Sequence, residues 1–98
     1  MKKIIYPGTF DPIHNGHVDI AKRASEIFDE LIFVVAENPR KKPLFSVEER
    51  KSLVKKSTHD IENVSVRSTE SLVVDFASKE AAVAIIRGLR HVSDFEFE

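Results

Sequence analysis

Two histidines and a threonine lie close together near the start of this 98-residue chain, in a stretch rich in proline and glycine. Residues 6–17 read Y-P-G-T-F-D-P-I-H-N-G-H and separate a short apolar segment from a helical pattern. Such a loop brings the hydroxyl of Thr9 and the imidazoles of His14 and His17 to a helix N-terminus. Backbone N–H groups and the helix dipole favour an anion there. These residue types therefore indicate the binding of a reacting phosphate.

The histidine pair also fits two roles that involve no phosphate. Taken alone, an H-x-x-H spacing more often gives helix-capping or solvent-facing imidazoles, and it fits two ligands of a zinc ion. The chain has no cysteine, and no third ligand lies nearby in the sequence to support zinc. On the phosphate interpretation, Gly16 allows a ligand to come close to the backbone.

The rest of the chain predicts the framework that holds this loop. Strand patterns cover residues 2–6, 31–36, 63–68 and 82–86, and helical patterns cover residues 16–28, 46–57 and 71–80. Ser46 and Glu49 have the spacing of a capping box. The alternation predicts an α/β domain, a Rossmann-like three-layer α/β/α arrangement with a mostly parallel sheet. The apolar run 31–36 is typical of a strand buried on both faces.

Three predicted loops follow the carboxyl ends of strands. They are residues 8–17, the basic stretch 38–43, and residues 87–90, which read R-G-L-R. Because ligands of parallel sheets bind at this edge, we expect three loops suited to phosphate to meet on one rim.

Composition limits the classes of partner. The chain has 15 Lys and Arg against 16 Asp and Glu, a formal net charge of −1, so neither nucleic acid nor a membrane is expected as a partner. The longest apolar run is too short to span a bilayer, and the N-terminus lacks a signal-peptide core. We expect a cytoplasmic protein. Its last six residues begin a helical pattern, so we expect residues 1–98 to be the N-terminal portion of one longer domain.

Taken together, the motifs resemble those of the nucleotidyltransferase superfamily, whose HxGH motif binds nucleotide phosphates. The pattern Y-P-G-T-F-D-P-x-x-N-G-H, the K-K-P at 41–43 and the I-R-G-L-R at 86–90 are similar to those of bacterial phosphopantetheine adenylyltransferases. The resemblance implies transfer of AMP from ATP to 4′-phosphopantetheine, giving dephospho-coenzyme A and pyrophosphate. It further implies Mg²⁺ on the ATP phosphates, a homo-oligomer that is hexameric in the family, and a Ser-rich phosphate loop that these residues lack.

The resemblance also assigns roles by position. His17 is the catalytic residue, which stabilises the transition state. The residues assigned to ATP are Thr9, Phe10, His14, His17, Gly88, Leu89, Arg90 and Glu98. Those assigned to phosphopantetheine are Thr9, Lys41, Val73 and Arg87. His59 and His91 match no site, and we expect His59 on the surface.

Two other functions stay open from the residues alone. One is a different HxGH nucleotidyltransferase, acting on nicotinate mononucleotide or as a cytidylyltransferase, although K-K-P and R-G-L-R argue against it. The other is a truncated fragment that binds nucleotide or coenzyme A without catalysis. A class I aminoacyl-tRNA synthetase has a similar motif, but the chain is too short and lacks a basic surface.

Overall fold

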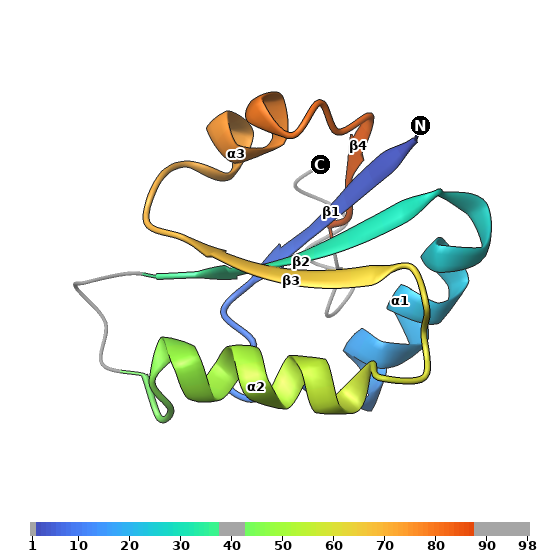
Figure 1. Cartoon of the computed structure of the whole chain (residues 1–98). Helices are drawn as coiled ribbons and strands as arrows, with labels where there is room; N and C mark the ends of the chain where they lie inside the picture. Colours follow the sequence, from blue (N-terminus) through green and yellow to red (C-terminus); the bar gives the residue numbers. More distant parts are fainter. Residues whose placement is uncertain (1, 38–42, 88–98) are drawn as a thin grey trace, which may run out of the picture.

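The computed structural model describes residues 2–37 and 43–87. Its elements are β1 (Lys3–Gly8), α1 (Asn15–Ile27), β2 (Glu30–Ala36), α2 (Val47–Ser57), β3 (Val64–Thr69), α3 (Val73–Lys79) and β4 (Ala84–Ile85) (Figure 1). The predicted order and types of element are confirmed. The fourth strand is shorter than the predicted range 82–86, because it pairs only with Ile4 and Ile5 of β1.

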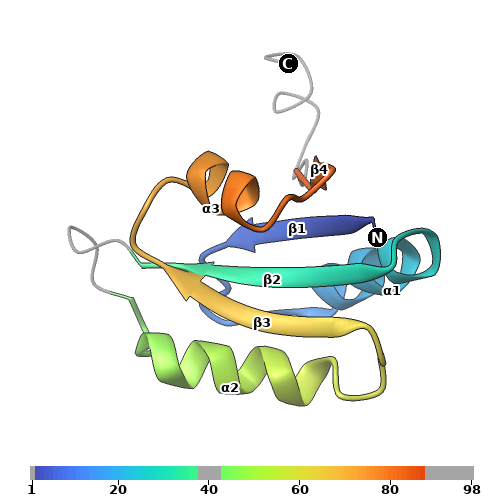
Figure 2. The ribbon, with the colours of Figure 1, turned by 45° about the horizontal axis from the view of Figure 1, so that its top comes forward.

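The strands form one parallel sheet in the order β3-β2-β1-β4. Helices α1 and α2 cover one face and α3 lies on the other, as Figure 2 shows. This is the three-layer α/β/α arrangement that the sequence predicts. It places the ends of β1 and β2 side by side in register, with Gly8 opposite Val35.

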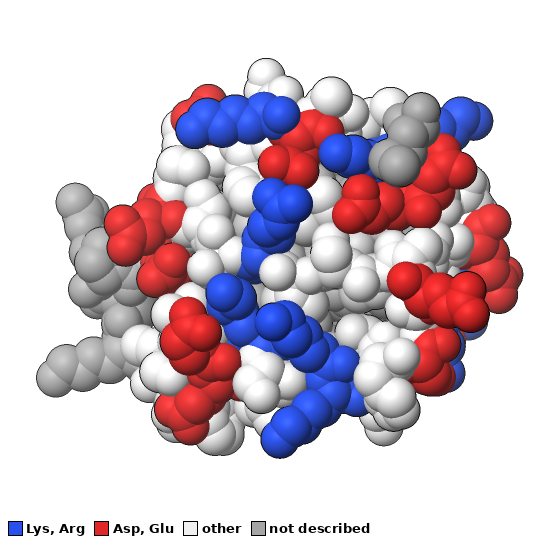
Figure 3. Space-filling model, in the orientation of Figure 1, with Lys and Arg blue, Asp and Glu red and all other residues white. Residues whose placement is uncertain are grey.

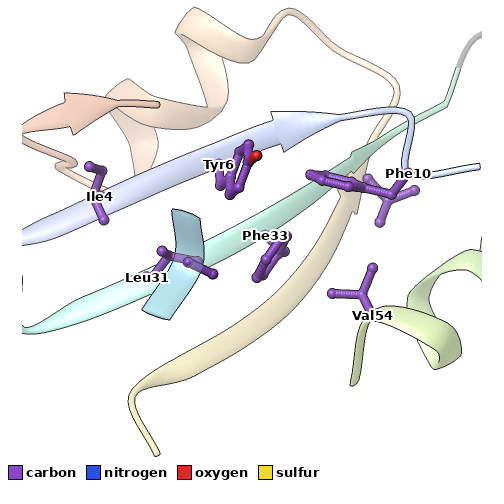
Figure 4. Packing of buried hydrophobic residues seen from close by; sticks show 8 residues of the cluster. Ile4, Tyr6, Phe10, Leu31, Phe33 and Val54 are labelled. Carbon is purple, nitrogen blue, oxygen red and sulfur yellow. The ribbon is translucent and has the colours of Figure 1, made fainter. Parts of the chain in front are cut away.

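The core lies on both faces of β2, whose residues from Leu31 to Val35 are fully buried. On the face under α1 and α2, the rings of Tyr6 and Phe10 each lie 5.2 Å from the ring of Phe33 (Figure 4). On the other face, Ala77 of α3 packs in the cluster that contains Ile5, Ile32 and Val34. Burying one such large side chain contributes about 1.5–3 kcal/mol, so β2 anchors the sheet.

Helix α2 starts with the predicted capping box. Ser46 Oγ accepts the Glu49 N–H at 3.2 Å, and Glu49 Oε1 accepts the Ser46 N–H at 3.2 Å. Two N–H groups that the helix itself cannot pair are thereby satisfied. The start of α2, close to the end of β2, is fixed by residues within a single turn.

At the amino end of the sheet, one amide closes the connections. Asn63, just before β3, donates from Nδ2 to the carbonyls of Ser25 at 2.9 Å, Phe28 at 3.1 Å and Asp29 at 3.3 Å. These carbonyls lie at the end of α1 and in the turn that leads to β2. The Asn63 side chain therefore ties the start of β3 to the continuous stretch 25–29, which connects α1 to β2.

Charges of both signs occur together on the face of the molecule that carries β3 and α2 (Figure 3). On the face of Figure 3, which carries β3 and α2, Lys and Arg side chains are interspersed with Asp and Glu. Within residues 2–37 and 43–87, no helix has the length and apolar character that a bilayer span requires.

Candidate functional site

The segment between β1 and α1 leaves the carboxyl edge of the sheet through Thr9 and Phe10. Thr9 is exposed, whereas the Phe10 side chain is only 3% exposed and its backbone adopts a left-handed conformation with φ of 47°. A Cβ on Gly8 would lie 3.1 Å from the Phe10 ring, so a larger residue there would crowd the ring. Because the Phe10 ring belongs to the core, only the main chain of Phe10 is free to contact a ligand.

His14 and His17 cap α1 with each other's help. His14 is the N-cap residue, and its Nδ1 accepts the Gly16 N–H at 3.1 Å. The Nδ1 of His17 accepts the His14 N–H at 3.1 Å. The two rings stack with their centroids 3.7 Å apart. The arrangement is a capping box in which both side chains are imidazoles.

This capping fixes the tautomer of each neutral ring. A nitrogen that accepts an N–H must offer its lone pair, so each Nδ1 is unprotonated and each neutral ring carries its hydrogen on Nε2. The Nε2–H groups remain as donors that the cap does not use. The cap therefore does not exclude anion binding, which the sequence presents as its alternative, because the cap uses only the Nδ1 atoms.

His17 is held more firmly than His14. Its ring lies 4.9 Å from that of Phe10 and 6.0 Å from that of Tyr6, both edge to face. Partial burial, and secondarily the charge of His14 when protonated, lower the pKa of His17 from its ordinary value of 6.5. Near neutral pH, His17 is therefore a neutral, oriented hydrogen-bond donor at a helix N-terminus.

The need for glycine at position 16, between the two histidines, has a local cause. A Cβ on Gly16 would lie 2.9 Å from Cε1 and 3.0 Å from Nδ1 of His14, closer than side chains tolerate. The sequence suggests that Gly16 makes room for a ligand, but in the structure the first group that needs the room is the His14 ring. The H-x-G-H spacing thus follows from the cap itself.

The other predicted site residues fall into three groups. Arg87 is exposed and comes two residues after β4, which pairs in parallel with Ile4 and Ile5 of β1. Val73 is half-buried and begins α3, beyond the end of β3. The remaining predicted positions, Lys41, Gly88, Leu89, Arg90 and Glu98, lie outside the described residues, as does His91.

His59, predicted on the surface, is exposed beyond the end of α2, and its Nδ1 donates to the Lys56 carbonyl at 2.9 Å. In the part of the chain that the structure describes, no group of three His, Asp or Glu side chains is arranged to hold a metal ion. The zinc alternative for His14 and His17 therefore gains no third ligand from these residues.

Two residues that the sequence interpretation missed connect the loops at this edge. The Asp11 carboxylate accepts the Leu44 N–H at 2.7 Å and the Phe45 N–H at 3.0 Å. Arg50 of α2 is 4% exposed and donates to the main-chain carbonyls of three separate segments. Its spacing from Val47 and Val54 places Arg50 on the apolar face of α2, which is the signal that could have revealed it.

Residues 5–98 match the model of the Cytidylyltransferase-like family, and the chain belongs to this family. It is 59% identical over 98 residues to the phosphopantetheine adenylyltransferase of Moorella thermoacetica, covering all of this chain and 61% of the relative. It is 57% identical to that of Clostridium novyi, again over the whole chain and 61% of the relative. The chain thus spans about three fifths of the length of these curated relatives.

A solved structure supports the fold. The lipopolysaccharide core biosynthesis protein from Thermoplasma volcanium superposes with a TM-score of 0.73 over 93% of this chain and 77% of that one. The sequence identity is 24%, so the likeness concerns the arrangement of the sheet and helices alone.

Proposed function

We propose that this chain supplies the nucleotide site of a phosphopantetheine adenylyltransferase, which transfers AMP from ATP to 4′-phosphopantetheine. The observation that carries the proposal is the His14–His17 cap, which leaves two Nε2–H donors at the N-terminus of α1. The names of the relatives supply the acceptor, since their identity extends over the whole chain.

In the proposed reaction, a phosphate oxygen of 4′-phosphopantetheine attacks the α-phosphorus of ATP. A new P–O bond forms while the bond from the α-phosphorus to the bridging oxygen breaks, and pyrophosphate leaves with the bonding electrons. The nucleophile is already an anion, so no base has to create it. What the protein supplies is alignment of the two substrates and stabilisation of the charge that builds up.

The residues take their roles from this requirement. His17 donates from Nε2 to the phosphate under attack, and His14 and the α1 N-terminus add a second donor and a favourable dipole. Thr9 offers its exposed hydroxyl to both substrates. The roles of Lys41, Val73 and Arg87 toward phosphopantetheine, and those of Phe10, Gly88, Leu89, Arg90 and Glu98 toward ATP, remain predictions from the resemblance.

ATP would enter as its Mg²⁺ complex, so the metal belongs to the substrate. The product is dephospho-coenzyme A, which places the reaction in coenzyme A synthesis. Assembly as a homohexamer and a cytoplasmic location are further parts of the proposal that rest on the resemblance alone.

Pyrophosphate release tests the proposal. Because the chain spans only part of its relatives, it is assayed alone and as an extended chain, in which the Moorella thermoacetica sequence following the aligned region is joined to residue 98. Each protein receives Mg²⁺, ATP and one acceptor: 4′-phosphopantetheine, nicotinate mononucleotide or none. We expect the extended chain to release pyrophosphate only with 4′-phosphopantetheine, and to form dephospho-coenzyme A in equal amount.

Turnover with nicotinate mononucleotide instead would contradict the proposed acceptor and support a different nucleotidyltransferase. Binding of ATP without turnover of any acceptor, in an extended chain shown to be folded by circular dichroism, would support a non-catalytic nucleotide-binding module.

A further inference from the structure

Arg50 is a buried cation, and its three hydrogen-bond partners within residues 2–37 and 43–87 are all neutral. Its Nε donates to the Phe45 carbonyl at 3.1 Å, and its Nη1 donates to the carbonyls of Thr9 at 3.0 Å and Ala36 at 3.1 Å. These carbonyls belong to the segment after β1, the last residue of β2 and the segment before α2. Among the described residues, no carboxylate pairs with Arg50 within 4.0 Å.

Asp11 completes this connection from the opposite side. Its carboxylate accepts the N–H groups of Leu44 and Phe45, so the main chain of Phe45 is held at its N–H by Asp11 and at its carbonyl by Arg50. We call this set of bonds from Arg50 and Asp11 to Thr9, Ala36, Leu44 and Phe45 the rim clamp.

The rim clamp reaches the candidate site within one residue. Thr9, which Arg50 holds, precedes Phe10, whose ring lies 4.9 Å from that of His17. A displacement of Thr9 therefore moves the hydroxyl assigned to both substrates and disturbs the packing that orients His17. Asp11 lies on the same segment, between Phe10 and the capping histidine His14.

A side chain does not need a charge to donate hydrogen bonds to several main-chain carbonyls. At the amino end of the sheet, Asn63 joins three carbonyls with a neutral amide. A buried guanidinium bonded only to carbonyls is costlier to desolvate than an amide, and its rigid fork fixes the directions of its donors more strictly. A cation at this edge suits a site whose proposed ligands are polyanions. The fixed donor directions of a guanidinium suit a site in which the segments around it must keep a fixed spacing.

We propose that Arg50 is a positioning residue for the transfer reaction, and that Asp11 shares this role through the rim clamp. The inference rests on the proposed function. It assigns to Arg50 no contact with substrate: Arg50 keeps Thr9 at a fixed place relative to the end of β2 and the entrance of α2. When the clamp is lost, each substrate retains its own contacts, but the alignment of the two reacting groups is lost.

The first test is Arg50→Lys in the extended chain, because lysine keeps the charge but cannot reproduce the fixed donor geometry of the guanidinium. We expect kcat to fall by about 10–100-fold, since small misplacements of reacting groups have effects of this size. The KM for ATP should change by less than about threefold, because binding and alignment are separate requirements. Asp11→Asn leaves Arg50 in place and should give the same pattern, with the double variant no worse than the poorer single variant.

Asn63→Ala is the control at the other end of the sheet, since it also removes hydrogen bonds to three carbonyls, here within the single connection between α1 and β2. We expect it to lower the unfolding midpoint without changing kcat at a temperature where every variant is folded. If Arg50→Lys and Asp11→Asn also lowered only the midpoint, the clamp would be purely structural and the proposal would be wrong.

A second readout does not depend on turnover. In the 98-residue chain without substrate, amide hydrogen exchange at Leu44 and Phe45 should accelerate at least about tenfold in Arg50→Lys, relative to amides of β2 in the same protein. Unchanged exchange would overturn the clamp whatever the enzyme's acceptor. If exchange were faster but the extended chain transferred AMP to another acceptor, the rim clamp would be supported and phosphopantetheine would be rejected as the substrate. The kcat of the variants would then be measured with that other acceptor.

Discussion

At each end of the sheet, a single side chain donates hydrogen bonds to several main-chain carbonyls, within one α1–β2 connection at the amino end and on three separate segments at the carboxyl end. At the amino end it is the neutral amide of Asn63, and at the carboxyl end it is the buried guanidinium of Arg50. The two ends thus meet the same requirement, that buried carbonyls find donors, with different chemistry. On the proposed function, this difference is expected, because the carboxyl end would also have to accommodate polyanionic ligands.

The histidines at the carboxyl end also differ from the histidine that lies elsewhere. His17 and His14, at the carboxyl end, cap a helix with Nδ1 and leave Nε2–H groups available. His59, beyond the end of α2, makes one hydrogen bond with the Lys56 carbonyl and lies apart from the candidate site. Residue type alone does not separate these histidines, whereas their hydrogen bonds do.

Replacing His17 is the strongest test of whether the histidines at the carboxyl end differ in function from His59. We expect His17→Ala in the extended chain to reduce turnover about 10²–10³-fold, or about 3–4 kcal/mol, the usual effect of losing one donor to a transition state. The measurement is pyrophosphate release at saturating substrates. His59→Ala is the matched control and should leave turnover unchanged.

His17→Gln separates the two uses of the His17 ring. Glutamine at this position of a capping box can accept the N-cap N–H, so the helix cap and the stability should largely return. Its amide does not reproduce the orientation of the imidazole Nε2–H, so turnover should stay low. Full turnover in His17→Gln would show that His17 acts only as a cap.

The second test concerns the amino end. Asn63→Ala leaves carbonyls of the α1 terminus and the following turn without a donor, and we expect a loss of about 1–3 kcal/mol in the free energy of unfolding. Urea denaturation of the 98-residue chain measures it. The affinity for ATP, measured by calorimetry well below the unfolding midpoint, should not change; weaker ATP binding would mean that the two ends are coupled.

The sequence predicted the elements of this fold more completely than the contacts of its site. Continuous apolar runs and the Ser46–Glu49 box depend on neighbours along the chain, so periodicity and spacing were enough to find β2 and the start of α2. Apart from the Arg50–Phe45 bond, the hydrogen bonds of Arg50 and Asp11 span 14 to 41 residues of sequence, and only the folded chain brings these partners together. The β4 strand was predicted too long because its length depends on pairing with β1.

Gly16 gives a smaller but sharper test of the histidine cap. Alanine normally stabilises a helical position by about 0.5–1 kcal/mol relative to glycine. In this chain, a Cβ would meet the His14 ring at 2.9 Å, so we expect Gly16→Ala to destabilise the protein instead, by about 1 kcal/mol. In a His14→Ala background the clash is gone, and the same change should become stabilising. If its sign were the same in both backgrounds, the cap would not be what requires glycine.

The smallest expected effect is the pH dependence of the cap. Burial lowers the pKa of His17 from 6.5, so between that native value and 6.5 the unfolded chain binds more protons than the folded one. Stability should therefore fall as the pH drops below about 6.5, and this contribution is fully lost once the pH is below the native pKa. The physical reasons are the partial burial of the His17 ring and, secondarily, the charge of His14. A protonated Nδ1 also could not accept the His14 N–H. Urea denaturation at pH 7.5 and at several values down to pH 5 measures the slope, and His17→Gln should remove part of it. An equal slope in both proteins would mean that His17 titrates alike in the folded and unfolded chains, and the cap would then not depend on its neutral form.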